Sequence, residues 1–184
     1  MRKLVTVVSA VAGLLLATAG AASGPAAAAA PCSGQILTNP GFERGTTGWT
    51  SGPRIVVLGD QVRPAHTGRA YAALAGLDLS HSDVIRATVT VPANCTLTLG
   101  FWVRATTTET SRGDYLNAGL SVTGVPPKTI FSFAFDHPAQ WTRHTTTWSA
   151  AATERTAIVS FAAAESAGGG VTAFDVDDVT ITLG

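Results

Sequence analysis

The sequence predicts an all-β fold, a two-sheet antiparallel β-sandwich in one domain. Short stretches rich in Val, Thr, Ile and Phe recur along the chain, whereas the 3.6-residue apolar spacing of an amphipathic helix is nearly absent. Gly, Pro, Asn and Asp separate these stretches, as turn residues do. Since no internal repeat and no long linker follows the Ala-rich leader, we expect seven or more strands around a single core.

Residues 1–30 have the composition of an export signal, with Arg2 and Lys3 ahead of the apolar run Leu4–Leu16 and an Ala/Gly-rich tail. The apolar run is shorter than the ~20 residues of a membrane-spanning helix. Small residues fit several cleavage positions, so the mature start is placed only loosely, near Pro31. Because this proline, not a small residue, precedes the first cysteine, no lipid anchor is expected.

The mature region, residues 31–184, has the length of one domain. The whole chain has 12 Lys and Arg against 12 Asp and Glu, and two of the basic residues lie in the leader, so the mature net charge is near −2. No basic stripe interrupts this balance, which excludes nucleic acid as the expected partner. We expect a secreted monomer that has no membrane partner.

Cys32 and Cys95 are the only cysteines. In an exported protein an isolated pair is most simply a disulfide, and two free or intermolecular thiols are the alternative. The bridge would close a loop of about 60 residues and, on the chain-entropy model, stabilise the fold by about 4 kcal/mol. It would also tie down the N-terminus.

The clearest strand patterns are Val84–Val91 and Thr96–Arg104, which alternate between apolar and polar residues. Pro92, Ala93 and Asn94 supply a short turn between them, so the two runs are interpreted as a hairpin. Five further segments have strand length and composition: Leu116–Thr123, Thr129–Asp136, Trp141–Trp148, Ala157–Ala163 and Phe174–Leu183.

Alternation divides the second of these strands into two faces. The predicted core face consists of Leu97, Leu99, Phe101 and Val103. The opposite face consists of Thr98, Gly100, Trp102 and Arg104. A large aromatic ring beside small and polar neighbours indicates a sheet face with an open groove.

The ordered set of segments resembles the carbohydrate-binding modules of families 4, 9 and 22, especially the small actinobacterial-type modules appended to secreted hydrolases and proteases. The resemblance extends over nearly the whole mature chain and implies a galactose-binding-like jelly roll. Its segments are Leu37–Glu43, Gly45–Trp49, His66–Tyr71, Val89–Pro92, Thr98–Val103, Trp141–Arg143 and Phe174–Val179.

The same resemblance implies a structural calcium ion. Glu43 and Asp177 match the family's carboxylate ligands, and carbonyl oxygens of Thr67 and Gly68 are candidates to complete the six to eight ligands that Ca²⁺ takes. The alternative is that Glu43 caps a turn. In that alternative the acidic residues Asp175, Asp177 and Asp178 form a solvated strand edge.

Sugars pack on aromatic rings and hydrogen-bond to polar groups at the ring edge. The candidate ligand contacts are Trp102, Arg104, Asp114 and Tyr115, which we expect to line one groove. The alternative for the other tryptophans, Trp49, Trp141 and Trp148, is that they close the ends of the sandwich. Phe131, Phe133 and Phe135 share one strand face and are expected in the core.

No catalytic arrangement is predicted. A glycosidase needs two carboxylates placed across the scissile bond, and nothing in the sequence positions such a pair. Five acidic residues are therefore interpreted as charged loop residues: Glu109, Asp114, Asp136, Glu154 and Glu165. The histidines lack zinc-site spacing: His66, His81, His137 and His144. The expected function is therefore non-catalytic binding of an extracellular polysaccharide or cell-wall glycan, and the alternative is a structural or protein-interaction sandwich.

Overall fold

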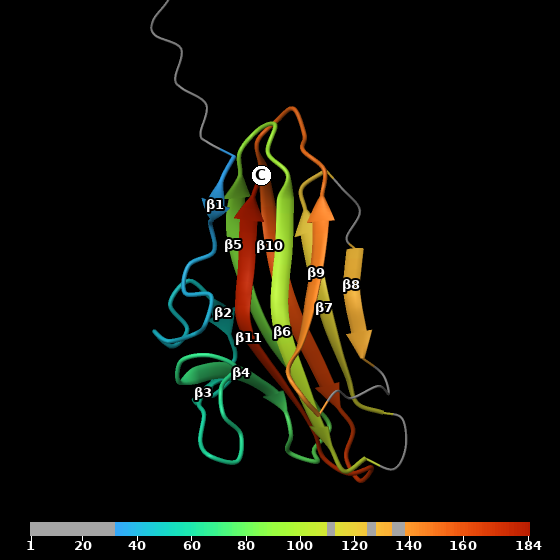
Figure 1. Ribbon diagram of the computed structural model, residues 1–184. Helices are drawn as coiled ribbons and strands as arrows, with labels where there is room; N and C mark the ends of the chain where they lie inside the picture. The colour runs from blue at the N-terminus through green and yellow to red at the C-terminus, as the bar shows by residue number, and fades with distance from the viewer. Residues whose placement is uncertain (1–31, 110–112, 125–127, 134–138) are drawn as a thin grey trace, which may run out of the picture.

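The computed structural model describes residues 32–109, 113–124, 128–133 and 139–184, with the strand at 128–133 described by its backbone. The predicted leader and its cleavage position lie outside these residues. The described residues form strands, turns and bends, and they include no helix long and apolar enough to cross a membrane. Figure 1 shows the longest strands running along the long axis of the molecule.

Sheet A holds six strands, all antiparallel to their neighbours. Its order is β3 (Val56–Leu58), β4 (Ala70–Ala75), β11 (Thr172–Leu183), β6 (Leu97–Thr107) and β9 (Thr142–Trp148). The sixth strand, β1 (Gly34–Gln35), pairs with the end of β11. β11 therefore lies in the interior of sheet A.

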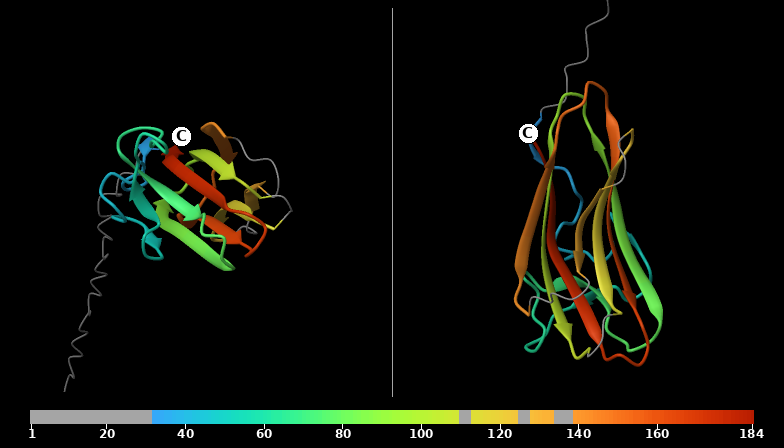
Figure 2. Two further views of the ribbon diagram at one scale, coloured as in Figure 1. Left: turned by 90° about the horizontal axis from the view of Figure 1, so that it is seen from below. Right: turned by 90° about the vertical axis from the view of Figure 1, so that its right-hand side faces the viewer.

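Sheet B holds five strands in the order β2 (Thr50–Ser51), β5 (His81–Val91), β10 (Arg155–Glu165), β7 (Tyr115–Val122) and β8 (Lys128–Phe133). The two sheets stack face to face as separate layers, which the turned views make visible (Figure 2). The predicted two-sheet β-sandwich is confirmed.

The core lies between the sheets and follows from the alternation of side chains along each strand. The predicted core face of β6 is confirmed, since Leu97, Leu99, Phe101 and Val103 are buried. Phe101 meets Phe161 of sheet B edge to face, with ring centroids 5.1 Å apart. Such an aromatic pair stabilises a core by about 1 kcal/mol beyond the area it buries.

The predicted hairpin is wrong. β5 belongs to sheet B, where it pairs with β10 along its whole length, and β6 belongs to sheet A. The segment between them crosses the end of the sandwich, held by hydrogen bonds from Asn94 N–H to the Ala151 carbonyl (2.6 Å) and from Thr96 N–H to the Gly184 carbonyl (2.8 Å). Turn residues alone do not distinguish a hairpin from such a crossing.

The other predicted strands are found with small shifts of their ends. β7, β9, β10 and β11 each overlap the segment predicted for them, and β8 covers the first part of Thr129–Asp136. Residues 134–136 lie outside the described residues, as do the side chains of Phe131, Phe133 and Phe135. The short strands β1, β2 and β3 had no strand prediction of their own, and β4 begins within His66–Tyr71, the segment that resembles a strand entry of the family.

The predicted disulfide is present. Cys32 and Cys95 are bonded, with a sequence separation of 63, and Cys95 is fully buried. The bridge fastens the chain just before β1 to the loop that joins the two sheets.

Replacing both cysteines by alanine is expected to lower the free energy of unfolding by about 4 kcal/mol, because the unfolded chain then loses its closed loop. Urea unfolding followed by tryptophan fluorescence measures this change. The control is wild-type protein with and without reductant. A double variant as stable as the oxidised wild type would contradict the expected role of the bridge.

Candidate functional site

Trp102 lies on the outer face of sheet A, as the alternation predicts, but a loop covers it. The loop comprises residues 59–69 between β3 and β4, and we call it the covering loop. His66 of this loop stacks on Trp102 with ring centroids 4.0 Å apart, and Trp141 packs edge-on against the same histidine at 5.7 Å. Trp102 is half-buried as a result.

Arg104 is buried on the same face and is already engaged. Its Nε and Nη2 donate to Asp175 Oδ2 of β11 at 3.0 and 2.7 Å, and its guanidinium lies 4.5 Å from the ring centroid of Trp141. Arg63 of the covering loop forms a second ion pair with the other oxygen of Asp175. The expected open groove beside Arg104 is therefore filled by the protein itself.

Asp175→Asn is expected to destabilise the fold by about 3 kcal/mol, because it leaves the buried Arg104 guanidinium without its counter-charge. Thermal unfolding with circular dichroism detection measures the effect. Asp60→Asn in the exposed part of the covering loop is the matched control and should leave the midpoint nearly unchanged. Equal stability of the two variants would show that Arg104 does not depend on Asp175.

The candidate contacts Asp114 and Tyr115 lie in the other sheet, so the expectation that all four candidates line one groove is wrong. Asp114 precedes β7, is buried, and its Oδ1 accepts the N–H of Ser166 at 2.8 Å. Tyr115 begins β7 and is 41% exposed. It is the only exposed aromatic residue that the described parts of the chain contain.

The outer face of sheet B is open. Its described outward positions are exposed or half-buried, and they alternate with inward positions that are buried all along β7 and along most of β5 and β10. Beside Tyr115 the floor is made of small side chains. The outward residues on β7 and β10 are Tyr115, Asn117, Gly119, Ser121, Thr156, Ile158, Ser160, Ala162 and Ala164.

The pairing register arranges these outward residues in rows across the strands. One row runs from Tyr115 to Ala164 to Ser82, with one residue each from β7, β10 and β5. Another runs from Gly119 to Ser160. An exposed aromatic ring beside small and polar side chains is an arrangement on which a sugar ring can stack. The sequence gives little signal for this surface, because Ala occurs on both the inward and the outward face of β10.

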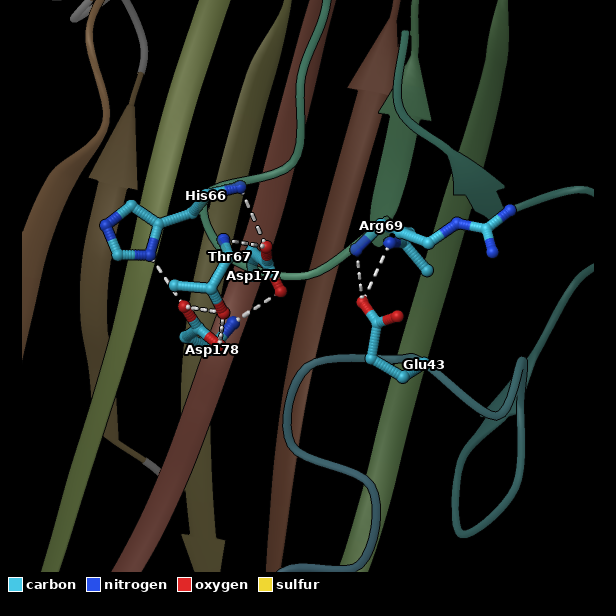
Figure 3. A network of polar contacts seen from close by, with 7 residues as sticks. Glu43, His66, Thr67, Arg69, Asp177 and Asp178 are labelled. Atoms are coloured by element: carbon cyan, nitrogen blue, oxygen red, sulfur yellow. Dashed lines mark hydrogen bonds and ion pairs between the residues drawn. The ribbon is translucent and has the colours of Figure 1, made fainter.

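The predicted calcium ligands gather around the covering loop, as Figure 3 shows. Glu43 Oε1 accepts the N–H groups of Arg69 and Ala70 at 2.7 and 2.8 Å. These backbone donors hold the pKa of Glu43 below its ordinary value. The turn-capping alternative for Glu43 is thus observed, and Gly68 lies so close that a Cβ built on it would overlap the Glu43 carboxylate.

Asp177 lies beneath the same loop, at a bulge of β11. Its Oδ2 accepts the N–H groups of His66 at 2.9 Å and Thr67 at 3.3 Å, and its Oδ1 accepts the N–H of Asp178 at 2.7 Å. Burial raises the pKa of Asp177 to about 6. Since Asp175 and Asp177 are fully buried in an interior strand, the alternative of a solvated acidic edge is wrong for them.

These residues fit a calcium ion in their chemistry. Glu43 and Asp177 offer hard carboxylate oxygens on two sides of one loop, and a divalent cation would offset the burial of Asp177. Among the described residues no group of three or more acidic, histidine or cysteine side chains is arranged to hold a metal. Carbonyl oxygens, such as those predicted from Thr67 and Gly68, would have to complete the set.

The remaining aromatic candidates divide between core and surface. Trp49 is buried, packs on Phe42 with centroids 4.9 Å apart, and donates its indole N–H to the Asn39 carbonyl at 3.0 Å. Trp148 packs partly buried against the core. Trp141 instead lies on the outer face of sheet A with Trp102, so the interpretation that it closes a sandwich end is wrong.

Some of the acidic and histidine side chains that the sequence offered as catalytic candidates hold loops in place, whereas Glu154 is exposed and His144 of β9 packs on Phe101. Buried Glu165 accepts the N–H groups of Leu77 and Asp78, both at 2.8 Å, and His81 lies 3.5 Å from it. Glu109 accepts the N–H of Asp114 at 3.3 Å. Asp136 and His137 lie outside the described residues.

The fold of this chain has counterparts among proteins of known structure. No protein-family model and no curated protein matches the sequence. A family 61 carbohydrate-binding module solved in complex with β-1,4-galactotriose superposes with a TM-score of 0.58 at 22% identity, covering 81% of this chain and 98% of the module. The chain folds like a carbohydrate-binding module.

Two further structures extend this likeness. A family 16 carbohydrate-binding module gives a TM-score of 0.53 at 16% identity and covers 80% of this chain and 99% of its own. A cyclase from Fischerella sp. TAU gives 0.52 at 14% identity, covering 82% of this chain and 97% of its own. At such identities the likeness shows the fold, and the fold serves both binding modules and an enzyme.

Proposed function

We propose that the protein is a secreted, non-catalytic module that binds an extracellular polysaccharide or cell-wall glycan on the outer face of sheet B. The observation that carries this proposal is the exposed ring of Tyr115 beside a floor of small residues on β7 and β10. The fold shared with carbohydrate-binding modules supports it. The disulfide supports export, because such bonds persist in oxidising compartments.

Binding is favoured over catalysis by what the acidic side chains do. Glu165 accepts backbone N–H groups with both carboxylate oxygens, and Asp114 and Glu43 each accept backbone N–H groups with one, so these carboxylates hold loops in place. A glycosidase needs two carboxyl groups that face each other across the bond to be cleaved. The proposal therefore assigns these groups a structural role.

Tyr115→Ala is expected to weaken glycan binding about tenfold, because the sugar ring loses its stacking partner. Affinity electrophoresis against soluble glycans and pull-down with insoluble ones measure this change. Tyr115→Phe keeps the ring and should bind within about threefold of the wild type.

Trp102→Ala tests the competing location on sheet A. If the glycan lay over Trp102, this variant would lose binding while Tyr115→Ala kept it, and the placement on sheet B would be wrong. Because the covering loop stacks on Trp102, its folded state must be verified by circular dichroism.

The structural calcium ion is a separate proposal, with Glu43 and Asp177 as ligands. Removing calcium with a chelator should lower the melting temperature, by about 3 °C for each kcal/mol of binding free energy lost. Differential scanning calorimetry with and without added Ca²⁺ measures this shift. Glu43→Gln should abolish the difference between the two conditions, and an unchanged midpoint in metal-free wild type would reject the site.

A further inference from the structure

The row that contains Gly119 and Ser160 continues beyond β10. Ser160 pairs with Arg86 of β5, and Arg86 pairs with Thr50 of β2, so one row crosses four strands of sheet B from β7 to its β2 edge. Gly119 and Ser160 are half-buried, whereas Arg86 and Thr50 are exposed. A chain laid along this row would run across the strands and leave the sheet at β2.

A cleft of about 460 Å³ lies at that edge. Thr50 and Ser51 of β2 line it, together with Trp49 and Arg54 of the flanking segments. The remaining lining residues are Thr46, Gly52, Pro53 and Val56, so the cleft contains a cation, hydroxyl groups and no acidic side chain. Its size suits a ligand group rather than a single water molecule.

The charged side chains along this path are both positive. Arg86 is the only charged residue among the described outward positions of β2, β5, β7 and β10, and Arg54 adds a second positive charge in the cleft. Within the described residues neither guanidinium has an ion-pair partner, in contrast to Arg63 and Arg104 on sheet A. Asp83 of β5 is no partner, because its side chain turns inward and accepts the N–H of Ala75 at 2.8 Å.

From this geometry we propose that the glycan is acidic: a polysaccharide whose carboxylate groups pair with Arg86 on sheet B and with Arg54 in the cleft beside β2. The inference rests on the proposed function and adds the ligand's charge and path. A guanidinium forms two parallel hydrogen bonds with a carboxylate, which gives both affinity and orientation. The net charge of the mature region is near −2, so the protein as a whole does not attract polyanions. Binding of an acidic glycan would therefore depend on these two arginines.

The experiment compares matched polysaccharides that differ in charge alone. Polygalacturonate, alginate and hyaluronate are each titrated beside their carboxyl-reduced forms, with cellulose, xylan and β-1,4-galactan as neutral probes, by isothermal titration calorimetry or pull-down. The expected result is binding to at least one carboxylated polymer that weakens tenfold or more on carboxyl reduction. Binding should also weaken as salt is raised.

The variants locate the interaction. Arg86→Gln and Arg54→Gln should each weaken binding to the carboxylated polymer about tenfold and leave binding to its reduced form unchanged. Arg143→Gln, an exposed position on β9 of sheet A, removes the same charge elsewhere and should have little effect.

The outcomes separate the two proposals. Equal or better binding of neutral glycans, still sensitive to Tyr115→Ala, would overturn the acidic ligand and keep the proposed function. Equal losses in Arg143→Gln and Arg86→Gln would overturn the path on sheet B, since charge alone would then explain binding. Failure to bind any polymer of either set would overturn both.

Discussion

The structure depends on the need to compensate acidic side chains buried in an interior strand. β11 carries Asp175 and Asp177 on the outer face of sheet A, and both are fully buried. A buried carboxylate is tolerated only with hydrogen-bond donors or a counter-charge. Arg104 of β6 provides one partner for Asp175, and the covering loop provides Arg63 for Asp175 and the amides of His66 and Thr67 for Asp177. The loop therefore lies over sheet A because β11 requires it.

This requirement makes the two outer faces of the sandwich unequal. On sheet A the region around Trp102 and Arg104 is covered by a loop that is held by the ion pair of Arg63 with Asp175 and by the stacking of His66 on Trp102. The described outward positions of β2, β5, β7 and β10 in sheet B carry Ser, Thr, Ala, Gly and a few larger side chains, and each of these positions is exposed or half-buried. A surface of small residues with one exposed ring is left open to a ligand. The difference in exposure between the two faces thus follows from where the acidic residues lie.

Alternation in the sequence predicted the strands and their inward residues, because a period of two is sufficient to identify a half-buried strand. It did not predict which strands pair, since β5 and β6 alternate equally well in one sheet or in two. β2 and β3 are too short to show any period. The covering of Trp102 by the loop was also beyond prediction, because an outward face has the same pattern whether solvent or a distant loop lies over it. Tyr115 was a sequence candidate because it flanks the strand after Trp102, but the sequence did not predict that it would lie beside β10 in the other sheet.

The two ends of the described chain are neighbours. Gly34 of β1 lies opposite Leu183 of β11, and Thr96 holds the terminal Gly184 through two backbone hydrogen bonds, so start and finish meet at the same pole of the molecule (Figure 1). Domains whose two ends lie close together at the surface commonly accept insertion into another protein and circular permutation. For protein engineering, this pole is where a linker or a display scaffold belongs. Attached there, the domain would project its strands lengthwise away from its carrier and keep both flanks of the sandwich accessible.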